Sequence, residues 1–150
     1  MPRVIETKIE ICAPPEKVWE VLIDFTRYPE WNPFVKTVEG DFLEGVALKV
    51  YLEPPEGKPM AFNPTITKIE PAKRFVWLGR VLFPGLFDGE HRFEIETLNK
   101  NCVIFHHSES FSGLLSSLIL KLVSQSTEAG FHAMNTALKQ RVEDKCNEKH

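Results

Sequence analysis

Two histidines and a glutamate, His91, His107 and Glu109, are the side chains of this sequence best suited to acid–base chemistry. They lie in two segments that alternate polar and apolar residues, as strands with one buried face do. If a turn of about three residues around 98–100 joins these segments, odd positions share one face, and His91 lies across from His107 or Glu109. On an apolar wall, such a group can orient a polar ligand or exchange protons near neutral pH. A bulge in the turn would shift the register and separate them.

A second interpretation is that these three side chains satisfy one another inside a wet cavity. No metal is expected at them, because no spaced motif such as HExxH accompanies them. No cofactor is expected either, since the chain contains no GxGxxG motif and no phosphate-binding loop, and it also lacks the GxSxG motif of serine hydrolases. Cys12, Cys102 and Cys146 are widely spaced and form no CxxC pair, which predicts reduced thiols in a cytoplasmic protein.

The composition is typical of one globular domain spanning residues 1–150. Hydrophobic residues make up 43% of the chain and charged residues 26%, so disorder is not expected. The net charge of -3 comes from interspersed charges without a basic run, so nucleic acid is not an expected partner. No apolar run reaches about 18 residues, so we expect neither a signal peptide nor stable insertion into a membrane. The oligomeric state stays open.

The elements that must position the three polar residues follow from the periodicity. Residues 4–12 alternate polar and apolar side chains, which predicts a strand with one wet face. A proline pair ends this strand, and residues 15–25 show the spacing of a short amphipathic helix. Strand patterns and turns then alternate over residues 35–111, which predicts an antiparallel meander. From 114 to 142 the period becomes helical, which predicts one helix of about 45 Å.

A single helix is too narrow to cover such a sheet. Six or seven strands at about 4.8 Å spacing make a sheet about 30 Å wide, whereas a helix is about 10–12 Å across. We therefore expect the sheet to curl around the helix and to enclose either large side chains or a cavity. In the middle of the helix, the side chains on the apolar face are small, which favours a cavity; these residues are Ser126, Ala129, Gly130 and Ala133. The alternative is a close contact between helix and sheet, or a kink, at Gly130.

This order of elements resembles the START and Bet v 1-like superfamily over about residues 3–142. The segments that carry the resemblance are IxIxAPPEKVWEVLxD, YPEWNPF, FxPTITKIEPAKRFVWLG, HRFEIETL and HHSESFSGLL. Together they are most similar to the polyketide cyclase/dehydrase and lipid-transport branch. The resemblance implies an α+β helix-grip fold, in which a curved antiparallel sheet of six to seven strands wraps around a long C-terminal helix. Two short helices follow the first strand, and YPEWNPF forms the second helix and the turn after it.

The predicted cavity and the resemblance suggest binding of a small hydrophobic molecule, such as a lipid, a polyketide or another aromatic compound, between sheet and C-terminal helix. His91, His107 and Glu109 are the expected polar anchors. The residues expected to line the cavity are Trp31, Phe34, Phe62, Trp77, Phe87, Phe93, Phe105, Leu118, Leu122 and Met134. The apolar turn at 81–89 is expected to be a lip over the entrance or a loop tucked against the helix.

Two other functions stay open. The first is an enzyme that cyclises or dehydrates a bound polyketide-like chain, with His107, Glu109 and His91 as its catalytic candidates. Without such a reaction, no catalytic residue is expected. The second is a protein-interaction module that uses the outer face of the sheet. It requires a filled core and an exposed apolar patch on that face, which the charged residues of the first strand do not favour.

Overall fold

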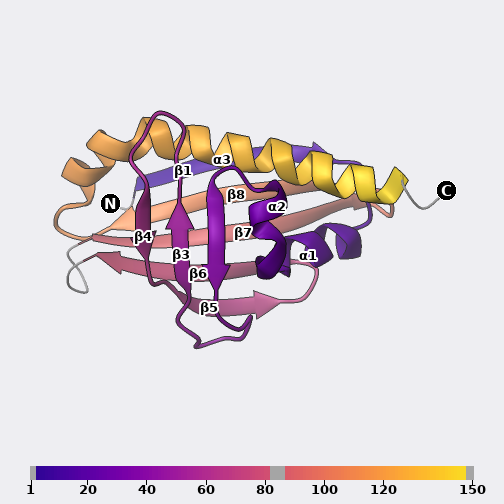
Figure 1. The fold of residues 1–150 in the computed structure, drawn as a ribbon, viewed down its shortest axis with the longest axis horizontal. Coiled ribbons are helices and arrows are strands. Elements are labelled where there is room, and N and C mark those ends of the chain that lie inside the picture. The colour runs from indigo at the N-terminus through magenta and orange to yellow at the C-terminus, as the bar shows by residue number, and fades with distance from the viewer. Residues whose placement is uncertain (1–2, 82–86, 148–150) are drawn as a thin grey trace.

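A large antiparallel sheet, a small antiparallel sheet and a long C-terminal helix make up the structure, a computed structural model that describes residues 3–81 and 87–147 (Figure 1). In chain order the elements are β1 (Arg3–Ile11), α1 (Pro15–Ile23), the 3-10 helix η1 (Phe25–Arg27), α2 (Tyr28–Trp31), β2 (Val35–Glu39), β3 (Lys49–Leu52), β4 (Met60–Phe62), β5 (Thr65–Glu70), β6 (Arg74–Val81), β7 (Phe87–Asn99), β8 (Cys102–Ser112) and α3 (Ser116–Asn147). None of the described helices is both long and apolar enough to cross a membrane.

The two sheets meet at a proline. The large sheet has the strand order β1-β8-β7-β6-β5 and the small sheet β2-β3-β4. A bridge between Ala47 and Thr65 joins them, and the N–H of Leu48 donates to the carbonyl of Pro64 at 2.8 Å. Because Pro64 has no N–H to donate, the ladder that pairs β3 with β4 is interrupted there and resumes beyond it at the Ala47–Thr65 bridge. The α+β helix-grip architecture is confirmed, with the strands in two hydrogen-bonded sets where one sheet was expected.

The short helices after β1 follow from local sequence. Pro15 occupies the first position of α1, where a missing N–H costs nothing, and the apolar side chains of α1 face the core. The chain then passes through η1 into α2. The side-chain oxygen of Asn32 accepts hydrogen bonds from the N–H groups of Phe34 and Val35 at 3.0 and 2.9 Å, which forms the turn into β2. YPEWNPF therefore is the second short helix and the turn that follows it, as expected.

A β-bulge sets the register of the β7–β8 hairpin. Asn99 pairs with Cys102, but Thr97 pairs with Val103, so Leu98 is an extra residue on β7. The tight turn alone would place odd positions opposite even ones. The bulge adds one residue and restores the pairing of odd with odd. A bulge was expected to destroy the arrangement of polar residues on the inner face, and in this hairpin it creates that arrangement.

The inner face of this hairpin is the predicted one. His91 lies opposite Glu109, and Phe93 lies opposite His107. Odd positions of β7 from Phe87 to Ile95 are buried, while the residues between them are at least partly accessible. The alternation of the sequence therefore identifies correctly the residues of β7 and β8 that point toward α3.

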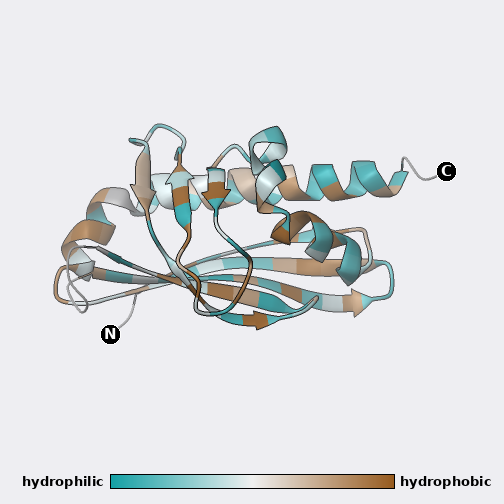
Figure 2. Ribbon diagram, turned by 60° about the horizontal axis from the view of Figure 1, so that its bottom comes forward, coloured by the Kyte–Doolittle hydropathy of each residue, from teal (hydrophilic) through white to brown (hydrophobic). Residues whose placement is uncertain are grey.

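The long helix α3 touches the small sheet closely at Gly130. A Cβ atom at this position would lie 2.9 Å from Cγ of Phe34 and still nearer to the edge of its ring. Phe34 is 1% exposed, so its ring packs closely against neighbouring atoms. Figure 2 shows the ends of β2, β3 and β4 next to the middle of α3. The absence of a side chain at Gly130 lets α3 pack directly against Phe34. This close contact is the alternative to a cavity that the sequence left open.

We expect Gly130→Ala to lower the free energy of unfolding by about 1–3 kcal/mol, because the new methyl group overlaps the buried Phe34 ring. Helix propensity alone would raise it by about 1 kcal/mol, so the two effects have opposite signs. Urea denaturation followed by circular dichroism measures the difference. In a Phe34→Leu background the same substitution should cost less. A stabilising Gly130→Ala would show that α3 and Phe34 are not in contact.

Candidate functional site

A buried chain of hydrogen bonds connects four elements inside the core. Asn135 on α3 donates from Nδ2 to Oγ1 of Thr7 on β1 at 2.8 Å, and this hydroxyl donates to the carbonyl oxygen of His107 at 2.8 Å. Nδ1 of His107 on β8 lies 2.8 Å from Oδ1 of Asn135. Nε2 of His107 lies 2.6 Å from Nε2 of His91 on β7. All four residues are buried.

The chain runs in one direction, and this fixes the tautomer of each histidine. The hydroxyl of Thr7 donates its single hydrogen to the carbonyl oxygen of His107, so toward Asn135 it can only accept, and its partner is the amide nitrogen. The amide oxygen of Asn135 therefore faces Nδ1 of His107. An amide oxygen only accepts, so His107 carries its hydrogen on Nδ1 and offers a lone pair at Nε2. His91 must then donate from Nε2. Its Nδ1 is left as an unprotonated acceptor.

That acceptor faces the carboxyl group of Glu109. Oε1 of Glu109 lies 3.9 Å from Nδ1 of His91, which is too far for a direct hydrogen bond. The carboxyl group lies over Gly89, where a Cβ atom would collide with Oε2. The Glu109 side chain is 17% exposed, whereas that of His91 is 3% exposed. Glu109 is therefore the accessible end of a buried chain.

Burial keeps all three ionisable groups of this chain neutral at pH 7. Loss of hydration raises the pKa of Glu109 to about 8. Burial also lowers the pKa of His107 to about 3, although its hydrogen bond with Asn135 opposes the shift. Burial and, second, the neighbouring His107 lower the pKa of His91. The end of the chain thus presents one acidic O–H group and one basic nitrogen without a net charge.

Aromatic rings pack on both sides of the histidines. The ring of His107 stacks on Phe131 of α3 with 4.1 Å between centroids, and the ring of His91 stacks on Phe93 at 4.3 Å. The ring of Trp77 packs edge-on against the ring of His91, with 5.3 Å between centroids. Rings therefore occupy the space between this part of the sheet and α3, and both nitrogens of His107 are engaged. His107 can orient His91 but cannot itself touch a ligand.

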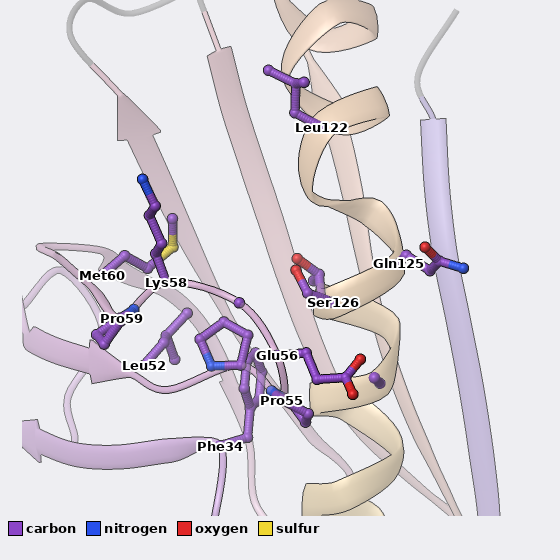
Figure 3. A pocket seen from close by; sticks show the side chains of 14 residues that line it. Phe34, Leu52, Pro55, Glu56, Lys58, Pro59, Met60, Leu122, Gln125 and Ser126 are labelled. Carbon is purple, nitrogen blue, oxygen red and sulfur yellow. The ribbon is translucent and has the colours of Figure 1, made fainter.

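An open pocket of about 890 Å³ lies to one side of these rings, between α3 and the loop that joins β3 to β4 (Figure 3). Its lining residues are Phe34, Leu52, Pro54, Pro55, Glu56, Gly57, Lys58, Pro59, Met60, Leu122, Gln125, Ser126, Thr127 and Ala129. Phe34 connects the pocket to the histidines, since its ring lies 5.8 Å from the ring of Phe131. On α3, the small side chains of Ser126 and Ala129 line this pocket, which lies beside the β3–β4 loop, whereas the predicted cavity lay between the helix and the sheet.

The residues expected to line a cavity occupy three kinds of place. Those that line the open pocket are Phe34 and Leu122. Those that pack buried in the core are Trp77, Phe87, Phe93, Phe105 and Met134. Those at the margin of the core are Trp31 and Phe62. The expected lip falls mainly on residues 82–86, which lie outside the described part of the chain.

Leu118 differs from its expected place in a cavity wall, because it is 60% exposed. The apolar positions of this helix come in adjacent pairs, here Leu118 and Ile119, so the pattern did not decide which one faces the sheet. Ile119 packs against the core, and Leu118 therefore points away from it. The sequence analysis therefore assigned the buried face of α3 about one residue away from its position in the structure.

Sequence reasoning missed the β3–β4 loop as part of a site. Its residues 54–59, PPEGKP, were interpreted only as a turn between strands. The pairing of β3 with β4 brings this loop against α3, so that a Cβ atom on Gly57 would lie 3.1 Å from Cβ of Ser126. Its prolines indicate a stiff loop, which is a local signal. Its contact with α3 is a tertiary feature that no local pattern encodes.

Comparisons with known proteins confirm the resemblance. The sequence profile of the family described as polyketide cyclase/dehydrase and lipid transport matches residues 2–143, and no curated protein sequence matches. The Zhui aromatase/cyclase from Streptomyces sp. R1128 is similar in structure (TM-score 0.79, 17% identity, covering 97% of this chain and 96% of that chain). So are a norcoclaurine synthase mutant from Thalictrum flavum (0.75, 15%, 97% and 97%) and a START superfamily protein from Mycobacterium smegmatis (0.70, 19%, 94% and 97%). At these identities the likeness shows a shared fold.

We expect Glu109→Gln to change how stability depends on pH. In the folded chain the pKa of Glu109 is about 8, and its ordinary value is 4.5, so between these values the folded state holds a proton that the unfolded state releases. Stability of the wild type should therefore fall relative to the variant as pH rises, by at most about 1.4 kcal/mol per pH unit. Urea denaturation of both proteins near pH 5 and near pH 8 measures this. Parallel profiles would mean that Glu109 is ionised in the folded protein at neutral pH.

Proposed function

Because the chain belongs to the polyketide cyclase/dehydrase and lipid-transport family, we propose that it binds a small hydrophobic molecule in the open pocket between α3 and the β3–β4 loop. The proposed ligand is a lipid, a polyketide or another aromatic compound. Binding of this kind needs no cofactor. The three free cysteines support a reducing, cytoplasmic location for this activity.

The observation that carries the proposal is the convergence of exposed apolar side chains in one hollow. Leu122 of α3 is 78% exposed and Met60 of β4 is 48% exposed, and both line the pocket (Figure 3). Single exposed apolar residues are common on protein surfaces, but a set that surrounds a concavity is typical of a ligand site. The volume of about 890 Å³ falls within the usual range of about 300–1,000 Å³ for small-molecule sites.

The pocket also offers different chemistry at its floor and at its rim. Phe34 and Leu52 are buried and give an apolar floor. Glu56, Lys58 and Gln125 bring charged and polar groups to the same pocket. A ligand with an apolar body and a polar head matches this division. Burial of about 300 Å² of apolar ligand surface would contribute about 7 kcal/mol before the costs of association.

Filling the pocket from the helix side tests this function. Ala129 is an exposed lining residue, so Ala129→Trp should place an indole in the hollow without disturbing the core. We expect affinity for anilinonaphthalene sulfonate, measured by fluorescence titration, to fall by about tenfold or more. Thr136→Trp is the matched control, because Thr136 is an exposed residue of the same helix outside this pocket.

Extraction of the freshly purified wild type into organic solvent, followed by mass spectrometry, should recover a lipid-like or aromatic compound that Ala129→Trp lacks. Unchanged affinity in Ala129→Trp, or an equal loss in Thr136→Trp, would exclude this pocket as the site.

A second candidate function is acid–base catalysis on a molecule that reaches the Glu109 end of the hydrogen-bond chain, which is separate from the lining of the open pocket. The fixed direction of the hydrogen bonds favours this function. Glu109 can give its proton to a departing hydroxyl group, while Nδ1 of His91 takes a proton from the neighbouring carbon. The products are water and a carbon–carbon double bond, and transfer of the proton from His91 back to Glu109 restores the pair. Thr7, Asn135 and His107 are positioning residues in this scheme, because they hold His91 in the required tautomer.

For this second function we expect Glu109→Gln and His91→Gln each to abolish dehydration of a β-hydroxyketone analogue, with affinity kept within a few-fold. Absorbance of the conjugated product measures turnover, and equilibrium dialysis measures affinity. Lost affinity with an unchanged turnover number would make both residues binding groups. Protein interaction, the third function considered, gains no support here, because the outer face of the large sheet carries Glu6, Lys8, Arg92, Glu94 and His106.

A further inference from the structure

Two cysteines that are remote in sequence meet at the edge of the large sheet. The register of β1 and β8 ends with Ile11 opposite Val103. Cys12 follows Ile11 and Cys102 precedes Val103, so the two thiols face each other across the strand ends. A carboxylate oxygen of Glu10 joins them, and the three potential ligand atoms all lie within 4.8 Å of one another.

We infer that Cys12, Cys102 and Glu10 form a binding site for a thiophilic divalent metal ion such as Zn²⁺ or Cd²⁺. Two thiolates and one carboxylate are a donor set that Zn²⁺ uses in proteins, and soft sulfur ligands select against Mg²⁺ and Ca²⁺. Cys12 and Glu10 are exposed, so an ion can reach the site and complete its coordination with water. This inference is independent of the pocket and of the acid–base chain.

Contacts from α3 hold the site in place. Oε2 of Glu143 accepts a hydrogen bond from the backbone N–H of Cys12 at 2.8 Å and one from Nζ of Lys139 at 2.6 Å. Lys139 also donates to the carbonyl oxygen of Glu10 at 3.1 Å. The backbone that carries two of the three ligands is therefore tied to the helix. Such outer contacts orient ligands and usually contribute to metal affinity.

The charges at the site favour a cation. Glu10 and Glu143 carry negative charge and Lys139 carries one positive charge, so the surroundings stay negative before any thiol ionises. A metal ion displaces the thiol protons when it binds, so its affinity should weaken as pH falls.

Titration of the reduced, metal-free protein with Cd²⁺, followed by the sulfur-to-metal charge-transfer absorption in the ultraviolet, tests the site. We expect saturation at one equivalent, and competition by Zn²⁺. Cys12→Ser and Cys102→Ser should each remove the saturable band. Glu10→Gln and Glu143→Gln should each weaken binding by about tenfold or more. Cys146→Ser is the matched control and should leave the titration unchanged, because Cys146 is a free cysteine outside this cluster.

Three results would overturn the inference. One is a titration without a saturable one-equivalent step. Another is an equal loss of binding in Cys146→Ser. The last is a freshly purified wild type whose mass is lower by two hydrogen atoms and whose peptide map links Cys12 to Cys102, since a disulfide would then take the place of the metal site. Circular dichroism of each variant confirms that the fold is retained.

Discussion

The hydrogen bond between His107 and Asn135 joins the large sheet to α3 inside the core, and the rest of the arrangement depends on it. A buried imidazole or amide left without its partner costs about 1–3 kcal/mol, so α3 can neither rotate nor slide on the sheet without a penalty. The orientation held in this way places Gly130 against Phe34 and turns Ser126 and Ala129 toward the β3–β4 loop. Close contact on one side of the helix and open space on the other are two results of one helix orientation.

The sheet was expected to be wider than α3 and therefore to leave a hollow beneath the helix. In the structure, other elements cover the part of the sheet that α3 leaves free. The short helices and the small sheet lie over the part of the large sheet that α3 does not reach (Figures 1 and 2). Phe25 from η1 packs edge-on against Phe75 of β6, with 6.0 Å between centroids, and thereby fills part of this space. The open pocket of about 890 Å³ lies at the flank of α3, next to the small sheet. A ligand there would contact the helix and a loop, with the aromatic core behind it.

Local periodicity was enough to predict the order of the elements and the inner face of β7 and β8, and the family resemblance implied the helix-grip architecture. The alternation around His91 and Glu109 identified a polar pair on an apolar wall, because strand geometry sends every second side chain to the same side. The same alternation placed Thr7 on the apolar face of the first strand, but Asn135 gave no such signal, since polar residues in an amphipathic helix are normally exposed. Their burial depends on contacts between the first strand and the last helix. The sequence also did not predict that Cys12 and Cys102 lie close together, because their proximity depends on the pairing of β1 with β8, which are remote in sequence.

The bulge at Leu98 has a consequence for how this sequence can change over generations. Leu98 is 47% exposed, so replacement of its side chain should change the stability of the fold little. Loss of Leu98 would leave Thr97 opposite Val103 and Phe93 opposite His107, because the bulge residue has no partner of its own on β8. Loss of a paired residue such as Glu96 would instead shift every pair beyond it by one and turn His91 and Phe93 to the outer face. The hairpin therefore accepts the loss of its bulge residue more readily than the loss of a residue from the paired part of β7.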